Sequence, residues 1–223
     1  MGQSRGAPGV ALIVSQATLI TTIIGHPYTV EDMMELKTLL FERAGKHNTT
    51  ETLQMVAKRA EALGIKQVVI ASSHGATARE AHELLSPSGV QVIAVTLSHS
   101  FESKGWPMTD EERKSLCALG IKICTGTHAL GDGVSSAFTA RNGGRGMEEV
   151  VRETLYRFSQ GTKVAVECLL MAADAGLLAM DQEVIAVAGT SSGADTALVC
   201  KPAYPRTFLD LEIREILAKP RIP

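Results

Sequence analysis

The chain of 223 residues is long enough to form one large α/β domain or two small ones. A net charge of −2 argues against a nucleic-acid-binding surface, and an aromatic content of only 4% argues against base-stacking platforms. The four cysteines form no CxxC pair, so we expect buried thiols in the reducing cytoplasm, not disulfides or a zinc site.

Residues 1–34 differ in composition from the rest of the chain. The segment Val10–Gly25 is apolar but contains serine and threonine residues, and it is shorter than the about 20 residues that span a membrane. Three interpretations stay open: the core of a signal peptide, an extra β segment, and an extension that the fold does not need. We expect no membrane span, a dispensable N-terminal extension over residues 1–34, and a single α/β ligand-binding domain over residues 35–223.

From Leu36 onward, strand-like and helix-like segments alternate regularly. Apolar runs predict strands at residues 37–42, 68–71, 91–96, 121–125, 183–189 and 196–201. The spacing of apolar residues predicts helices at residues 48–63, 78–85, 109–119, 135–141, 147–158 and 164–175. Asn48 with Glu51, and Thr109 with Glu112, have the spacing of capping boxes.

This alternation predicts a parallel, doubly wound sheet with helices on both faces. The last predicted strand follows its predecessor through a loop too short for a parallel crossover, so it must pair antiparallel. We therefore expect a three-layer α/β/α fold with a mostly parallel mixed sheet of about five strands. Ligands bind beyond the carboxyl ends of such strands. The polar loops at these ends are Ser72–Thr77, Leu97–Phe101, Gly126–His128 and Gly189–Asp195.

The loop Ser72–Thr77 lies between a buried strand and a helix. The free N–H groups and the positive dipole end of that helix favour an anion, most naturally a phosphate. Hydroxyl groups of Ser72, Ser73 and Thr77 add donors, and Gly75 would let a ligand approach the backbone closely. A simple helix cap made of small polar residues is the open alternative.

The segments ASSHGATA, VTLSHSF, MAADAG and VAGTSSGADTA, in this order, resemble the stand-alone relatives of the pyruvate kinase C-terminal α/β domain. The resemblance covers residues 36–220 and implies the same fold. It also implies phosphate binding, because the matching loop of pyruvate kinase binds a regulatory sugar phosphate. The catalytic barrel of pyruvate kinase has no counterpart, so no pyruvate kinase activity is implied. Some relatives resemble binders of flavin mononucleotide (FMN), which makes FMN the candidate cofactor.

These loops supply the candidate residues for binding a phosphorylated ligand. They are Ser72, Ser73, His74, Gly75, Thr77, Thr96, His99, Ser100, Phe101, Thr127, His128, Thr190, Ser191, Gly193 and Asp195. No catalytic residue can be assigned. We expect no metal site, because no carboxylate lies at ligand spacing beside the loop histidines.

Two further sequence patterns, a G-x-S-x-G motif and a group of charged residues on one helix, each allow more than one interpretation. Gly189–Gly193 fits the G-x-S-x-G motif of α/β hydrolases, but no histidine follows His128, so the Ser–Asp–His order is impossible and Ser191 is not expected to be a nucleophile. Lys163, Glu167 and Asp174 lie on an otherwise apolar helix. A solvated face is the favoured interpretation, with loop orientation or a subunit contact as the alternatives.

The first functional hypothesis is a protein that binds a phosphorylated small molecule, with FMN as the candidate, at the strand-end loops. The second is a flavin-dependent or sugar-phosphate enzyme that uses the same site. The third is a regulatory module that acts through contacts between identical subunits and binds no small molecule. We expect neither nucleic acid nor a membrane as a partner, and the sequence leaves both catalysis and homo-oligomer formation open.

Overall fold

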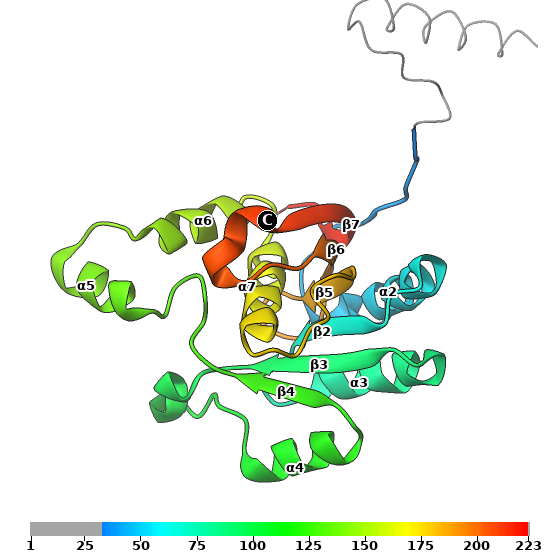
Figure 1. The fold of residues 1–223 in the computed structure, drawn as a ribbon, viewed down its shortest axis with the longest axis horizontal. Helices are drawn as coiled ribbons and strands as arrows, with labels where there is room; N and C mark the ends of the chain where they lie inside the picture. Colours follow the sequence, from blue (N-terminus) through cyan, green and yellow to red (C-terminus); the bar gives the residue numbers. More distant parts are fainter. Residues whose placement is uncertain (1–32, 223) are drawn as a thin grey trace, which may run out of the picture. The chain divides into compact units, whose positions relative to one another are not determined.

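The computed structural model describes residues 33–222 of the chain (Figure 1). The chain divides into two compact units, Met1–Lys37 and Thr38–Pro223. The expected extension over residues 1–34, with its segment Val10–Gly25, lies almost entirely outside the described residues, so its dispensability stays a prediction. The second unit carries the sheet and the helices described below.

A seven-stranded sheet forms the middle layer of the described part of the chain. Its strands are β1 (Leu39–Phe41), β2 (Gln67–Ala71), β3 (Gln91–Thr96), β4 (Lys122–Thr125), β5 (Val184–Ala188), β6 (Thr196–Lys201) and β7 (Glu212–Pro220). Their order is β1-β7-β6-β5-β2-β3-β4. Only β6 runs antiparallel to its neighbours, β5 and β7, among these strands. The predicted mixed sheet and its antiparallel strand are confirmed, whereas the expected number of about five strands is too low.

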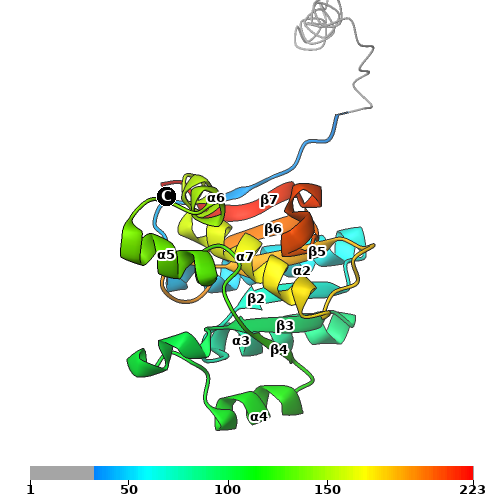
Figure 2. The same ribbon diagram turned by 60° about the vertical axis from the view of Figure 1, so that its left-hand side comes forward.

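Helices cover both faces of this sheet (Figures 1 and 2). On one face lies α7 (Gln160–Asp174), and on the other lie α2 (Thr49–Leu63), α3 (Ala76–Leu85) and α4 (Asp110–Ala118). The helices α5 (Val134–Asn142) and α6 (Met147–Leu155) follow β4. The three-layer α/β/α prediction is therefore confirmed. None of the helices in residues 33–222 is both long and apolar enough to cross a membrane.

Alternate residues of the central strands face two separate hydrophobic cores, because successive side chains of a strand point to opposite faces. Val68 and Ile70 of β2 pack in the core beneath α2 and α3. Val69 packs in the core beneath α7, together with Leu169. All three strand side chains are fully buried. Burial on both faces explains why β2 reads as a continuous apolar run.

The start of α2 differs from the predicted capping box. Asn48 occupies the N-cap position, but its side chain makes no cap hydrogen bond. Its amide nitrogen instead donates to the carbonyl of Arg43, at 2.7 Å. The second predicted box is confirmed, because Thr109 and Glu112 exchange both hydrogen bonds at the start of α4.

The strand β7 was not predicted from the sequence. Its apolar residues Ile213, Ile216 and Leu217 are three to four residues apart, which is helix-like spacing. Pairing with β6 nevertheless places the segment in the sheet. A two-point ion pair between Glu215 and Arg59 of α2 ties the strand to the helical layer, with Arg59 Nε 2.7 Å from a carboxylate oxygen. Tertiary contacts thus decide the conformation of this segment.

We predict that Leu217→Ala lowers the free energy of unfolding by about 2–4 kcal/mol, because Leu217 is buried in the core and its truncation leaves a cavity. Leu209→Ala is the matched control, since Leu209 is 95% exposed and its truncation should change stability by less than about 0.5 kcal/mol. Urea unfolding of both variants measures the difference. Equal stability of the two variants would show that β7 contributes no core packing.

The cysteines correct one expectation. Cys124, Cys168 and Cys200 are buried free thiols as expected, but Cys117 is exposed. Burial raises the pKa of all three buried thiols, that of Cys200 to about 12. Since the thiolate is the reactive form, both the burial and the raised pKa values protect these three groups.

We predict that a thiol reagent such as DTNB labels only Cys117 rapidly at pH 8. The three buried thiols should react only after unfolding in urea. A Cys117→Ser variant should therefore show no fast phase. A fast phase that survives this substitution would mean that one of the buried thiols is open to solvent.

Candidate functional site

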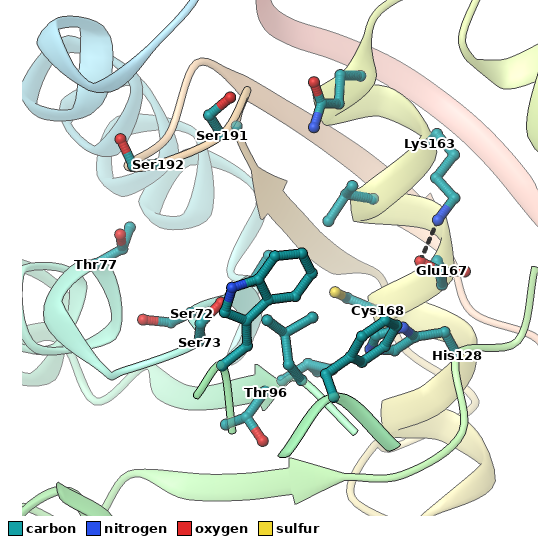
Figure 3. Close-up of a pocket in the computed structure, with 18 of the residues that line it drawn as sticks. Ser72, Ser73, Thr77, Thr96, His128, Lys163, Glu167, Cys168, Ser191 and Ser192 are labelled. Atoms are coloured by element: carbon teal, nitrogen blue, oxygen red, sulfur yellow. Dashed lines mark hydrogen bonds and ion pairs between the residues drawn. The ribbon is translucent and has the colours of Figure 1, made fainter. Parts of the chain in front are cut away.

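A pocket of about 1020 Å³ opens at the carboxyl ends of the central strands (Figure 3). The loops after β2, β3, β4 and β5 line it, together with residues of α6 and α7. Its volume lies at the upper end of the range of about 300–1000 Å³ that is typical of small-molecule sites. The location agrees with the rule that ligands bind beyond the strand ends of α/β sheets.

One end of the pocket is rich in hydroxyl groups, and we call it the hydroxyl end. It consists of Ser72, Ser73, Thr77, Ser191 and Ser192, which lie on the same side of the pocket in Figure 3. Ser72 accepts a hydrogen bond from the N–H of Ala78, at 3.3 Å, and so caps α3. Within the described residues, the hydroxyls of Ser73 and Thr77 make no hydrogen bond to protein, so they are free for a ligand.

The loop after β5 brings Ser191 and Ser192 to this end. Ser191 has a φ of 65°, in the left-handed region that non-glycine residues rarely adopt. Gly193 packs so tightly that an added Cβ would lie 2.4 Å from the Thr49 hydroxyl. Contacts with the start of α2 therefore hold the loop in its strained form.

Asp195 does not line the pocket, contrary to its prediction as a ligand residue. Its carboxylate is fully buried and accepts hydrogen bonds from the N–H groups of Gly45, at 2.8 Å, and Thr190, at 3.1 Å, and from the hydroxyl of Thr196, at 2.9 Å. These contacts leave it no access to a ligand. Asp195 is a structural residue that ties the loop after β5 to the start of α2.

Stacked aromatic rings also line the pocket. Phe101 stacks on Trp106, with ring centroids 5.5 Å apart, and on His128, at 5.7 Å. The ammonium group of Lys104 lies 4.5 Å from the centroid of Trp106. Phe101, Trp106 and His128 all line the pocket. They offer an apolar, flat surface against which a planar ring can pack.

The opposite side of the pocket carries ionisable groups, and we call it the charged end. It consists of the close contact of His128 with Asp132 and of two ion pairs, Arg152 with Glu153 and Lys163 with Glu167. The atoms in these contacts are 2.6, 3.2 and 2.5 Å apart, respectively. Figure 3 shows His128, Lys163 and Glu167 together, away from the labelled serines.

The favoured interpretation of α7 as a solvated face is wrong for Lys163 and Glu167, which are both buried. Only Asp174 is exposed. Glu167 uses one oxygen for Lys163 and the other for the N–H of Leu130, at 3.0 Å. The alternative interpretation, in which these residues orient a loop, therefore applies to Glu167. Its carboxylate holds the segment that follows β4 against α7.

The predicted site residues divide into two groups. Those that line the pocket are Ser72, Ser73, His74, Thr77, Thr96, Phe101, His128, Ser191 and Gly193. Those that do not are Gly75, His99, Ser100, Thr127, Thr190 and Asp195. His99, Ser100 and Thr127 are exposed outside the pocket, and the hydroxyl of Ser100 bonds that of Ser98.

Two of the lining residues have partners of their own. The hydroxyl of Thr96 is 2.6 Å from that of Thr125. His74 Nδ1 lies 3.1 Å from a carboxylate oxygen of Glu112. The Thr109 N–H, with help from His74, holds the pKa of Glu112 below its ordinary value. Both side chains therefore contribute to the structure of the pocket wall.

Gly75 is needed for close packing against α4. Its φ is 86°, and an added Cβ would lie 2.5 Å from a methyl group of Leu116 in α4. Gly75 is outside the pocket lining, and the expectation that it opens the backbone to a ligand stays a prediction. The sequence could not show the packing of Gly75 against Leu116, because Leu116 is distant in the chain.

We predict that Gly75→Ala destabilises the fold by about 1–3 kcal/mol more than Gly89→Ala, because it overpacks a filled core. Gly89 is the matched control, since it has a similar φ of 69° but nothing within 4 Å of its added Cβ. Both variants carry the same kind of backbone strain. Urea unfolding of both variants gives their free energies of unfolding, and the difference between them measures the effect of packing against Leu116. Equal losses of unfolding free energy would contradict the contact with Leu116.

Neither hydrolase nor metal chemistry finds support in the described residues. No histidine hydrogen-bonds the Ser191 hydroxyl there, and β6 follows the loop where a hydrolase has a helix. No group of three or more histidine, cysteine or acidic residues that could hold a metal ion occurs in residues 33–222.

Several lining residues were missed from the sequence. They are Trp106, Asp132, Arg152, Glu153, Tyr156, Gln160 and Cys168. One signal was available: Lys163 and Glu167 are four residues apart, the spacing of a helical ion pair, within an apolar helix. The contribution of α6 to the pocket lining has no comparable signal, because it depends on packing against α7.

The chain matches a model of a known protein family. The model described as "Pyruvate kinase, alpha/beta domain" matches residues 50–200. This range is more than half of the chain, and it contains every residue that lines the pocket.

Proposed function

Since the chain belongs to the pyruvate kinase alpha/beta domain family, we propose that it binds a phosphorylated small molecule in the pocket at the strand ends. The observation that carries this proposal is the hydroxyl end. Two loops and the start of α3 converge there, and hydroxyl groups that face the pocket have no protein partner in the described residues.

The phosphate is proposed to lie at the first turn of α3. The N–H groups of Ala76 and Thr77 begin this helix and have no partner inside it. The positive end of the helix dipole favours an anion at the same point. The hydroxyls of Ser73 and Thr77 supply further donors. Arg79 donates to the Ser115 hydroxyl, at 3.0 Å, and does not line the pocket, so neutral donors carry this binding.

FMN is the ligand that we propose first. The stacked rings of Phe101 and Trp106 provide a flat, apolar wall for a planar ring system. The pocket is also large enough for a ligand with both a ring and a phosphate-bearing chain. The resemblance to FMN-binding relatives points the same way.

An enzyme that uses this pocket is the second candidate. His128 Nδ1 lies 2.6 Å from a carboxylate oxygen of Asp132, in a residue that lines the pocket. A histidine beside a carboxylate is a frequent arrangement of a general base in enzymes. This pair is the observation that favours catalysis over binding alone.

We further propose a cytoplasmic location. All four cysteines are free thiols in the structure. Reducing compartments maintain such thiols, whereas oxidising compartments favour disulfides.

Calorimetric titration with FMN and with inorganic phosphate tests the proposed binding. We predict that Ala76→Asp weakens both by at least about tenfold, because it places a carboxylate beside the phosphate. Ala76 is exposed at the first position of α3, where an acidic side chain suits the helix dipole, so the fold should tolerate the change.

Ala76→Asn is the matched control, since it has nearly the same size without the charge, and it should bind within about threefold of the parent. Ser73→Ala should weaken binding by about tenfold or more, as the loss of one hydrogen bond to a charged group. If Ala76→Asp binds FMN as tightly as the parent protein, the phosphate does not lie at α3.

A further inference from the structure

The two permanent cations of the charged end, Lys163 and Arg152, are paired with carboxylates of the protein itself. Lys163 and Glu167 are buried and face each other, with side chains only 10% and 5% exposed. Arg152 contacts two carboxylates, those of Glu153, at 3.2 Å, and Glu149, at 3.6 Å. Each permanent cation at this end therefore already has at least one carboxylate partner.

Acidic groups also outnumber the basic ones here. The carboxylates of the charged end are Asp132, Glu153 and Glu167, with Glu149 beside Arg152 but outside the pocket lining, against the two permanent cations Arg152 and Lys163. A second anionic group of a ligand would meet this excess of negative charge. To gain a cation, it would have to break an ion pair, and for Lys163 that pair is buried, which is costly.

Uncharged donors and acceptors remain available at this end. The Tyr156 hydroxyl and the Gln160 amide both line the pocket and make no hydrogen bond to other described residues. His128 uses Nδ1 for Asp132, which leaves Nε2 for another partner. Groups of this kind hydrogen-bond hydroxyls and amides and carry no net charge.

We propose that the charged end is a subsite for an uncharged, hydrogen-bonding part of the ligand, such as hydroxyl or ring amide groups. The ligand consequently carries a single phosphate, held at the hydroxyl end, and the pocket discriminates against compounds with a second phosphate. This inference rests on the proposed function, because it assumes a phosphate at α3.

The test compares fructose 6-phosphate with fructose 1,6-bisphosphate, which differ by one phosphate. Calorimetric titration of the full chain should show the bisphosphate binding at least tenfold more weakly. Equal or tighter binding of the bisphosphate overturns the inference. The binding of inorganic phosphate to the parent protein and to the Ala76→Asp variant is measured in the same way. If inorganic phosphate does not bind the parent, or Ala76→Asp leaves its binding unchanged, the proposed function itself has failed.

Reversing the charge of Glu153 gives a second, independent test of the inference. Glu153 lines the pocket with its side chain half exposed, so Glu153→Lys should fold. It removes a partner of Arg152 and adds a cation, so binding of the bisphosphate should strengthen at least tenfold, while that of fructose 6-phosphate should change less than threefold.

Glu61→Lys is the matched control, because Glu61 is exposed in α2, outside the pocket, and the change in net charge is the same. It should alter the binding of neither sugar phosphate by more than about twofold, as expected for a distant, screened charge. If Glu153→Lys strengthens the binding of both compounds equally, or of neither, the charged end does not contact the second phosphate position and the inference is overturned.

Discussion

The fully buried carboxylate of Asp195 is the constraint on which the geometry of the pocket depends. A charge without a neighbouring cation is tolerated in the interior only when hydrogen bonds satisfy it. Asp195 obtains these bonds from Gly45 before α2, from Thr190 after β5 and from Thr196 at the start of β6. The segment before α2 and the segment 190–196 must therefore meet around one side chain, although Gly45 and Asp195 are 150 positions apart in the sequence.

The same network extends to α7. The hydroxyl of Thr196 is 3.2 Å from that of Ser159, and Ser159 accepts a hydrogen bond from the N–H of Thr162 as the cap of α7. Because the cap fixes where α7 begins, it also fixes where Lys163 and Glu167 lie. Glu167 in turn holds the N–H of Leu130 and so the segment that carries His128. A chain of buried polar contacts thus runs from the hydroxyl end to the charged end.

The features that the sequence predicts well are those encoded locally. The buried strand β2 follows from its apolar run, and the start of α4 follows from the Thr109–Glu112 spacing. The features that it misses depend on distant partners. β7 has helix-like spacing and becomes a strand only because β6 pairs with it, and Gly75 has a role only because Leu116 packs over it. Likewise, a GADTA segment gives no indication that its aspartate points inward.

The buried polar network also bears on the proposed phosphate site, because the described residues that line the hydroxyl end include no lysine or arginine. Neutral donors bind a phosphate well only if they are held in place beforehand, because each loose hydroxyl must otherwise lose conformational entropy on binding. Ser191, in its left-handed conformation, is held by the tight packing of Gly193 on Thr49 and by the bonds of Asp195. The strain of this loop persists because its surroundings determine it from several sides. The buried polar network therefore holds the neutral donors of the hydroxyl end in place. This rigidity compensates for the lack of a positively charged side chain in the lining of that end.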